Sequence, residues 1–551
     1  MGRLLVISNR LPFSVTQDGE KISLRQSSGG LVSAIKSYFE NDKESAKSNI
    51  TQKIWVGLGD FTREEWKELE PDYERKDFEV VPLFVDPDTY SDYYNGFSNS
   101  TLWPLFHYFP SLAEYNAEHF EAYKKVNELF AETLIPVIQP DDIIWIHDYQ
   151  LMLLPQLIRK AFPDALIGFF LHIPFPSYEI FRLIPTEWKR SLLTGLLGAD
   201  LIGFHTHDYV QYFIQSVKMV LGLDNTYNTI HYQHRLVKAD LFPIGIDYAK
   251  FRDATNDKEI ISIRDEIRNN FSNKKIIFSV DRLDYSKGLM DRLQGFECFL
   301  ERFPEWKERV VFIVNVVPSR DSIQTYNDRK RLIEEKISII NGLNATLSWQ
   351  PVIYRYNHLE FKELSALYQA ADVALITPLR DGMNLVAKEY VASCTSQRGV
   401  LILSELAGAA SELSEAILVN PTDVMEVSSA IQKALTMPLT EQRYRMILMQ
   451  KRLMDYDVFH WVNDFFEQLN LIKAEQRKMK VKVLDSETEE ILRKHYTQAK
   501  KRCILLDYDG TLSPFTRLPA DAIPGADLKT LLLELASDPK NNVVVISGRD
   551  A

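Results

Sequence analysis

Short apolar runs separated by longer segments of helical periodicity recur along almost the whole chain, and this alternation constrains the fold more than any other feature. The runs are nearly continuous rather than alternately polar, which is typical of parallel strands covered on both faces. Parallel neighbours need a crossover connection, which is usually a helix. The pattern therefore predicts an α/β protein, with strands at residues 4–8, 54–58, 80–85, 143–146, 166–173, 201–204, 241–244, 276–280, 310–317, 373–377, 400–404 and 417–419.

The predicted strands form two sets that divide near residue 245, within the sequence PIGID. At 551 residues the chain is too long for one hydrophobic core. We therefore predict two Rossmann-like domains that face each other across a cleft, one at residues 1–245 and the other at residues 246–455.

The sequence changes character after these two sets. An apolar helical face predicts a closing helix at residues 456–475 that packs back on the two domains. Residues 476–500 are highly charged, which predicts a linker with a solvated helix, and a partial α/β segment is expected at residues 501–551. The apolar face is formed by Trp461, Phe465 and Leu469.

Composition excludes several classes of protein. The net charge of −12 argues against a general nucleic-acid or acidic-membrane binder. The three cysteines are far apart in the sequence, so neither a disulfide framework nor a thiol zinc site is expected. Apolar runs of membrane-spanning length and an N-terminal signal region are not found, and a cytoplasmic protein is the expectation.

Residues 276–288 read IIFSVDRLDYSKG, a buried strand followed by a turn with two cations, Arg282 and Lys287. Open α/β sheets bind ligands at the carboxyl ends of their strands. Two cations at such an end suit a phosphate group. Taken alone, the stretch fits two solvated side chains in a surface turn equally well.

A second strand end carries the sequence PLRDGMNLVAKE. Its turn offers the Asp381 carboxylate and backbone N–H groups, and a helix is predicted to begin at Leu385. The start of a helix favours a diphosphate, and Glu389, one turn further on, is placed to bind ribose hydroxyls. An ordinary strand-to-helix loop is the alternative.

The first half of the chain has its own candidate residues. Arg10 ends the first strand, and the paired glycines Gly29 and Gly30 precede a predicted helix at residues 32–39, where the backbone can approach a phosphate or sugar. Residues 93–104, YYNGFSNSTLWP, combine aromatic rings with amides and hydroxyls, which suits either a sugar site or a packed loop.

Asp148 follows one predicted strand of the first half and His172 lies at the end of another, at positions where polar side chains reach a ligand site. Further histidines occur in pairs, but no thiol or H-E-x-x-H context supports zinc. These pairs are His205 and His207, which are expected to share one strand face, and His231 and His234.

Eight motifs follow one another along residues 1–475: SNRLP, SSGGL, YYNGFSNSTLWP, WIHDYQLMLLP, FFLHIPFPS, DRLDYSKG, VPSR and DGMNLVAKEYVA. In order and spacing this set resembles the trehalose-6-phosphate synthases. The resemblance implies a metal- and cofactor-free retaining glycosyltransferase of the GT-B arrangement. Such an enzyme transfers glucose from a nucleotide sugar, usually UDP-glucose, to glucose-6-phosphate in the first step of trehalose biosynthesis. Nucleotide preference and homo-oligomer formation stay open.

The resemblance also implies roles for single residues. On the acceptor side, the glucose-6-phosphate phosphate would be held by Arg10, Tyr94, Trp103 and Arg320, and a hydroxyl by Asp148. On the donor side, Gly30 beside Gly29 would approach the nucleotide sugar. The other donor positions are Arg282 and Lys287 for the diphosphate, the N–H groups of Asn384 and Leu385 beside it, His172 and Asp381 for the glucose, and Glu389 for ribose.

Near the C-terminus, LLDYDGTL and VVVISGR resemble motifs of haloacid-dehalogenase-type trehalose-6-phosphate phosphatases. There Asp507 would be the nucleophile, Asp509 the acid/base and Ser547 a phosphate contact, with Mg²⁺ between them. The later lysine and acidic ligands of such a site are not in the chain. Phosphatase activity is therefore not expected, and Mg²⁺ would be needed only by a complete phosphatase domain.

Two alternatives compete with this interpretation. One is an enzyme of the same fold with another acceptor, such as glycerol phosphate, which the intact acceptor set disfavours. The other is a non-catalytic sugar-phosphate sensor. Loss of a cationic or donor-site residue would favour a sensor, and the motifs retain all of them.

Overall fold

The structure is a computed structural model that describes residues 2–18, 21–26, 30–40, 50–69, 78–318, 324–480, 486–514, 516, 518 and 521–547. Its contacts divide the chain into two units, Met1–Ala474 and Glu475–Ala551. Within the described residues, no helix is both long and apolar enough to cross a membrane.

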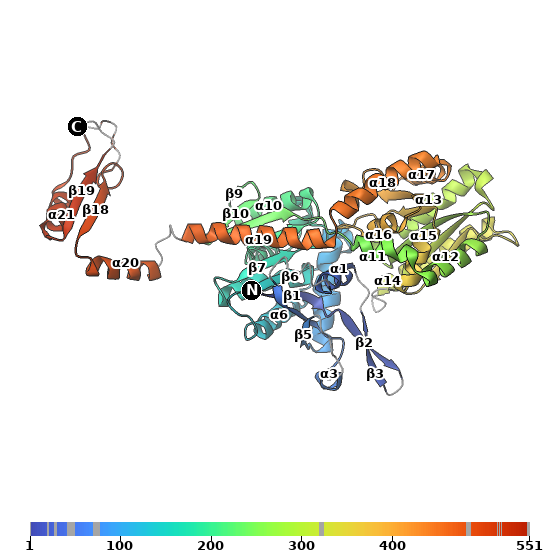
Figure 1. The fold of residues 1–551 in the computed structure, drawn as a ribbon, viewed down its shortest axis with the longest axis horizontal. Helices are drawn as coiled ribbons and strands as arrows, with labels where there is room; N and C mark the ends of the chain where they lie inside the picture. Colours follow the sequence, from blue (N-terminus) through green and yellow to red (C-terminus); the bar gives the residue numbers. More distant parts are fainter. Residues whose placement is uncertain are drawn as a thin grey trace. The chain divides into compact units, whose positions relative to one another are not determined.

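The first half of the larger unit is built on a sheet that has nine strands in the described residues (Figure 1). The order is β5-β4-β1-β6-β7-β8-β11-β10-β9, parallel as far as β11 and antiparallel at β10 and β9. The strands are β1 Gly2–Arg10, β4 Ile50–Leu58, β5 Glu79–Leu83, β6 Ile143–His147, β7 Leu166–Phe170, β8 Leu201–Phe204, β9 Asn225–Thr226, β10 Thr229–Tyr232 and β11 Arg235–Leu241. A separate hairpin pairs β2 Phe13–Asp18 with β3 Lys21–Gln26.

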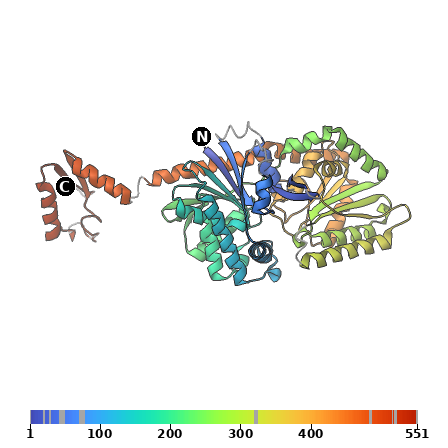
Figure 2. The ribbon, with the colours of Figure 1, turned by 90° about the horizontal axis from the view of Figure 1, so that it is seen from below.

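The second half of this unit contains a parallel sheet, with six strands among the described residues, in the order β14-β13-β12-β15-β16-β17 (Figure 2). The strands are β12 Lys275–Arg282, β13 Val310–Val317, β14 Val352–Tyr356, β15 Val373–Ile376, β16 Val400–Ser404 and β17 Ile417–Val419. The two parallel sheets confirm the predicted α/β class with two Rossmann-like halves.

Helices connect the strands of both sheets. In the first half they include α1 Gly30–Phe39, α3 Arg63–Leu69, α4 Pro87–Ser91, η2 Asp92–Leu102, α5 Trp103–Phe106, α6 Ala117–Leu134, α7 Leu154–Ala161, α8 Tyr178–Phe181, α9 Thr186–Leu196 and α10 His207–Leu221. In the second half they include α11 Tyr248–Asp253, α12 Lys258–Asn270, η6 Tyr285–Lys287, α13 Leu289–Arg302, α14 Gln324–Asn344, α15 Phe361–Ala370, α16 Leu385–Ser393, α17 Val424–Thr436 and α18 Leu439–Asp455.

The helix α19, Val458–Lys480, returns from the second half to the first sheet (Figure 1). Its predicted apolar face is fully buried, and the Trp461 ring lies 5.1 Å from that of Trp145 on β6. Further along, the Lys473 ammonium donates to the Ala165 carbonyl at 3.0 Å. The burial of Trp461, Phe465 and Leu469 agrees with the helical spacing, since one face of α19 is core.

Local pattern misplaced one strand, missed another and did not reveal the helix at residues 93–104. The strand expected at residues 241–244 lies earlier, as β11. The first residues of β11 are polar, so the apolar pattern did not reveal them, and the pairing of β11 is set by β8 and β10. The strand β14 was missed. Residues 93–104 are not a loop but the π-helix η2 running into α5, in which side chains such as Asn99 and Ser100 bond to backbone carbonyls five residues earlier.

The smaller unit contains α20 Ser486–Gln498, β18 Arg502–Asp507, α21 Ala526–Ser537 and β19 Asn541–Ile546. Its two described strands pair in parallel, Asp507 opposite Ile546. Apolar side chains of the unit, such as Leu505 and Leu533, are exposed.

Candidate active site

Both sheets share the strand order 3-2-1-4-5-6, which reverses direction between the first and fourth strands. In the first sheet this switch point lies between β1 and β6, and in the second between β12 and β15. A crevice opens at such a point because the flanking connections run to opposite faces of the sheet. At the first switch point Arg10 ends β1 and Asp148 follows β6. At the second, Arg282 ends β12 and Asp381 lies beyond β15.

At the second switch point the predicted cation and carboxylate are paired. The Lys287 ammonium lies 2.5 Å from Asp381 Oδ2, which also accepts a hydrogen bond from Asn384 at 3.0 Å. Burial by itself would raise the pKa of Asp381, but the Lys287 charge outweighs it and holds that pKa below its usual value. Arg282, by contrast, is exposed. One cation is thus fixed and the other is accessible to a ligand.

Helix α16 begins directly beside this pair. Asn384 adopts a left-handed conformation with φ of 81°, and its side-chain oxygen accepts from the Ala387 N–H at 3.1 Å. The helix therefore begins one residue after Asn384, whose side chain contacts Asp381, the partner of Lys287. One turn on, Glu389 accepts a hydrogen bond from the Tyr368 hydroxyl at 2.8 Å, and burial raises the pKa of Glu389.

Arg292 joins the elements at this end of the sheet and was not predicted from the sequence. Its guanidinium is almost fully buried and donates to Asp281 at 2.6 Å, to Thr377 at 3.0 Å and to the Lys287 carbonyl at 3.1 Å. It thereby joins β12, the end of β15 and the turn that carries Lys287. A signal was available, because Arg292 lies on the apolar face of α13 between Leu289 and Phe296.

At the first switch point, Arg10 lies among tyrosines. Its Nε and Nη2 donate to the Tyr90 hydroxyl at 3.0 and 2.7 Å, and its guanidinium lies 4.9 Å from the centre of the Tyr94 ring. The Tyr90 and Tyr94 rings stack at 5.4 Å. Tyr90 was not predicted, since its helix, α4, carries no motif of its own.

Asp148 directly follows β6 in a strained conformation, with φ of 76°. Its carboxylate accepts from the backbone N–H of His172 at 3.2 Å. Burial raises the pKa of Asp148 to about 7, against the opposing hydrogen bonds and the charge of Arg282. A carboxyl with such a pKa can accept or release a proton near neutrality.

The His172 ring is stacked among other histidines. Its Nε2 lies 3.0 Å from Nδ1 of His147, and its ring centre lies 5.4 Å from that of His205. Burial lowers the pKa values of His147 and His172 well below the usual range. The expectation that His205 and His207 share a strand face was wrong, because β8 ends at Phe204 and His207 begins α10.

The two switch points are in contact with each other. The Trp103 indole lies 3.4 Å from an Asp284 oxygen, and the Arg282 guanidinium is 5.9 Å from the centre of the Trp103 ring. Gly382 packs so closely on the first half that a Cβ there would fall 2.2 Å from the His172 carbonyl oxygen. Residues from both halves therefore meet at these strand ends.

A second close approach involves the two helix starts. A Cβ on Gly30, the first residue of α1, would fall 2.6 Å from a methyl group of Leu385, the first residue of α16. Gly29 and Arg320 lie outside the described residues. Among the described residues, no group of three histidine, cysteine or acidic side chains is arranged to hold a metal ion.

In the smaller unit, the residues predicted from phosphatase motifs lie together where the parallel strands end. The Ser547 hydroxyl donates to Asp509 at 3.1 Å, and the Thr511 hydroxyl donates to Asp507 at 3.1 Å.

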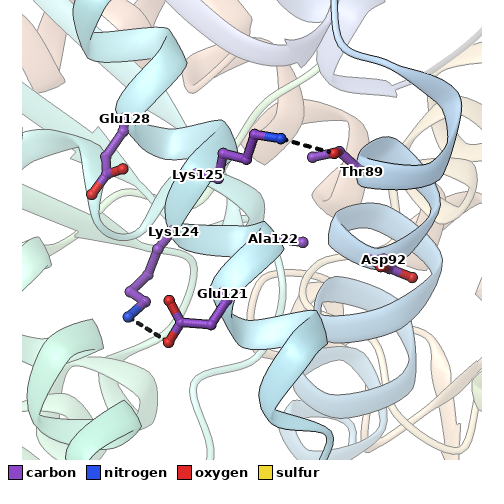
Figure 3. Close-up of a pocket in the computed structure, with 7 residues that line it drawn as sticks. All are labelled: Thr89, Asp92, Glu121, Ala122, Lys124, Lys125 and Glu128. Carbon is purple, nitrogen blue, oxygen red and sulfur yellow. Dashed lines mark hydrogen bonds and ion pairs between the residues drawn. The ribbon is translucent and has the colours of Figure 1, made fainter.

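A surface hollow of about 390 Å³ lies between α6 and the α4–η2 segment (Figure 3). Within the hollow, Lys124 pairs with Glu121 at 2.6 Å, and the Lys125 ammonium donates to the Thr89 hydroxyl at 3.2 Å. None of the predicted site residues is among those lining it: Thr89, Asp92, Glu121, Ala122, Lys124, Lys125 and Glu128.

Comparison with known families shows which family this chain belongs to. The model of glycosyltransferase family 20 matches residues 2–471. The chain belongs to glycosyltransferase family 20. A trehalose-phosphatase model also matches residues 505–551, so only a short part of the chain resembles that second family. Both matches confirm the resemblances stated from the motifs.

Individual members of family 20 are similar over most of the chain. The bifunctional trehalose-6-phosphate synthase/phosphatase of Thermoproteus tenax is 44% identical, over 99% of this chain and 74% of that protein. A UDP-forming α,α-trehalose-phosphate synthase from Burkholderia xenovorans, solved in complex with glucose-6-phosphate, is 34% identical with a TM-score of 0.75, over 85% of this chain and 100% of that one. An E. coli structure described as trehalose-6-phosphate bound with UDP-2-fluoro glucose has the same identity and TM-score, over 85% and 99%.

Proposed function

We propose that this family 20 chain transfers glucose from UDP-glucose to glucose-6-phosphate with retention of configuration, using the residues gathered at the two switch points. The reaction is that of a trehalose-6-phosphate synthase, and its product is α,α-trehalose 6-phosphate. The observation that carries the assignment of residues is the contact between the two strand-end clusters, with the cations and helix start on one side and Arg10, Asp148 and His172 on the other.

The donor diphosphate would lie at the second switch point. Negative charge grows on the diphosphate as the glycosidic bond breaks, and Arg282, Lys287 and the start of α16 oppose it. In a closed site each such contact contributes about 3 kcal/mol to the transition state. Glu389 would take the ribose hydroxyls, and the Asn384 and Leu385 N–H groups would lie beside the phosphates.

The acceptor would enter at the first switch point. Arg10, with Tyr94, Trp103 and Arg320, would bind the phosphate of glucose-6-phosphate. Asp148 would accept a hydrogen bond from an acceptor hydroxyl, since its carboxylate already lies at the strand end next to His172. Trp103 touches both sides, because its indole contacts Asp284 of the second half.

Retention does not require a carboxylate nucleophile in this proposal. Asp381 is paired with Lys287 and Asn384, which leaves it poorly placed as a nucleophile. The departing phosphate oxygen can itself take the proton of the attacking hydroxyl. The new bond then forms on the face of the glucose from which the nucleoside diphosphate departs. Contact between the halves excludes water and limits donor hydrolysis. The proposal needs no metal or cofactor.

One assay tests the proposal. The purified chain is incubated with glucose-6-phosphate and a panel of nucleotide-glucose donors, and nucleotide release and products are measured. We expect UDP release that depends on the acceptor and a non-reducing disaccharide phosphate as product. Arg264→Ala serves as the matched control for Arg282→Ala, because it removes an arginine that pairs with its neighbour Asp265 on α12. Nucleotide release that ignores the acceptor, or a product built on glycerol phosphate, would contradict the proposal.

A further inference from the structure

His147 is the last residue of β6, one position before Asp148. Its ring is fully buried and lies 4.3 Å from the Trp145 ring and 5.3 Å from the His172 ring, centre to centre. The contact with His172 is a hydrogen bond of 3.0 Å between His147 Nδ1 and His172 Nε2. A hydrogen bond between two ring nitrogens requires one to carry a proton and the other to lack it.

Burial among apolar and histidine side chains favours the neutral form of both rings. Burial comes first among the causes that lower both pKa values, and each ring also faces another histidine. Each neutral ring therefore holds a single proton, and two arrangements are possible. Either His147 donates from Nδ1, or His172 donates from Nε2.

The second nitrogen of His147 distinguishes the two arrangements. His147 Nε2 is buried and has no hydrogen-bond partner among the described residues. If His172 were the donor, the His147 proton would lie on Nε2, as an N–H group buried without an acceptor. Orphaned buried N–H groups are rarer and more costly than unsatisfied acceptors. The proton of His147 is therefore on Nδ1 and is donated to His172.

We propose that His147 is a positioning residue that fixes the tautomer of His172, so that His172 carries its own proton on Nδ1 and presents an N–H donor to the transferring glucose. His172 Nδ1 is not one of the buried atoms that lack a partner, and the residue lies against the Gly382 turn of the donor side. A sugar hydroxyl oxygen is a suitable acceptor for that donor. The inference rests on the proposed role of His172, which places it beside the glucose.

The tautomer can be observed without substrate. In the full chain labelled with ¹⁵N-histidine, the His172 signals are assigned by their loss in His172→Gln. We expect a one-bond proton coupling on His172 Nδ1 and an unprotonated Nε2. In His147→Phe, which keeps a ring but has no donor, the proton should redistribute towards Nε2. A protonated Nε2 in the unsubstituted chain would overturn the inference.

Kinetics test whether the tautomer matters. Loss of one oriented hydrogen bond predicts a fall of about tenfold in kcat/KM for UDP-glucose in His147→Phe. His147→Asn places an amide nitrogen near the position of Nδ1 and should recover most of that loss, although its ring is gone. A purely structural His147 predicts the reverse order, since Phe fills the buried space better than Asn.

The outcomes separate this inference from the proposed function. Wild-type kcat/KM in a folded His147→Phe would overturn the inference and leave the synthase reaction standing. Unchanged kcat/KM in His172→Gln would instead show that His172 does not act at the donor site. The positioning role of His147 would then have no basis. Thermal unfolding of each variant shows that the measured chains are folded.

Discussion

Arg282 and Lys287 carry the same charge, but the structure predicts different consequences when each is replaced by alanine. Arg282 is exposed and free to meet a diphosphate. Lys287 is held 2.5 Å from Asp381, and their side chains are only 11% and 15% exposed. Both substitutions should lower activity. Only Lys287→Ala should also lower stability, because it leaves a buried carboxylate without its partner.

The magnitudes follow from these environments. Each cation is expected to contribute about 3 kcal/mol to the transition state, so either alanine variant should lose about a hundredfold in kcat. Arg282→Ala should change the free energy of unfolding by no more than about 0.5 kcal/mol, as is usual for exposed sites. Lys287→Ala should cost about 3 kcal/mol, the lower end for breaking a buried pair, since this pair is not fully enclosed.

The assay combines acceptor-dependent UDP release with denaturant unfolding. The double variant Lys287→Ala with Asp381→Asn should recover much of the lost stability, because no unpaired charge remains, but none of the activity. Near-normal turnover in either single variant would remove the diphosphate assignment. Equal stability losses in Arg282→Ala and Lys287→Ala would refute the reasoning from burial and pairing.

Asp148 has a folded-state pKa of about 7 against an ordinary 3.8, so between these values the folded chain binds a proton that the unfolded chain does not. The free energy of unfolding should therefore fall as pH rises from about 4 to 7. Asp148→Asn should show a shallower dependence of the free energy of unfolding on pH, and an equal dependence would contradict the raised pKa. Arg10→Gln should raise KM for glucose-6-phosphate at least tenfold and leave KM for UDP-glucose within about twofold, and a rise in the donor KM instead would move Arg10 out of the acceptor site. Gly382→Ala should abolish turnover, because the added Cβ meets the His172 backbone. The control Gly342→Ala, on α14 with open space around it, should retain full activity. Equal activities in the two variants would show that turnover does not need the close approach of Gly382 to His172.

Much of the fold was predictable from pattern. Continuous apolar runs identified most central strands, since a strand buried on both faces has little room for polar side chains. The strands that were missed or misplaced, β14 and β11, are less apolar in sequence, and their pairing is set by neighbouring strands. The π-helix η2 escaped prediction because glycine, asparagine and serine favour turns locally, while here their side chains are held by backbone carbonyls.

The site was predictable in part, for a reason that lies in the sheet. Polar residues after apolar strands gather at one edge of a parallel sheet, so the candidate cations and carboxylates could be named without knowing how the strands are ordered. Residues that act from within helices gave weaker signals. Arg292 and Tyr90 are examples, because their partners Lys287 and Arg10 belong to other elements.

The sequence by itself determined that this chain forms parallel sheets with charged strand ends, because periodicity and strand-end chemistry are local properties. Only the tertiary structure decided which of those ends meet. Lys287 and Asp381 are 94 residues apart and pair because β12 and β15 are neighbours in the sheet, and Gly382 reaches His172 because the two halves pack together. Such contacts depend on strand order and on the packing of distant segments, which no local pattern encodes.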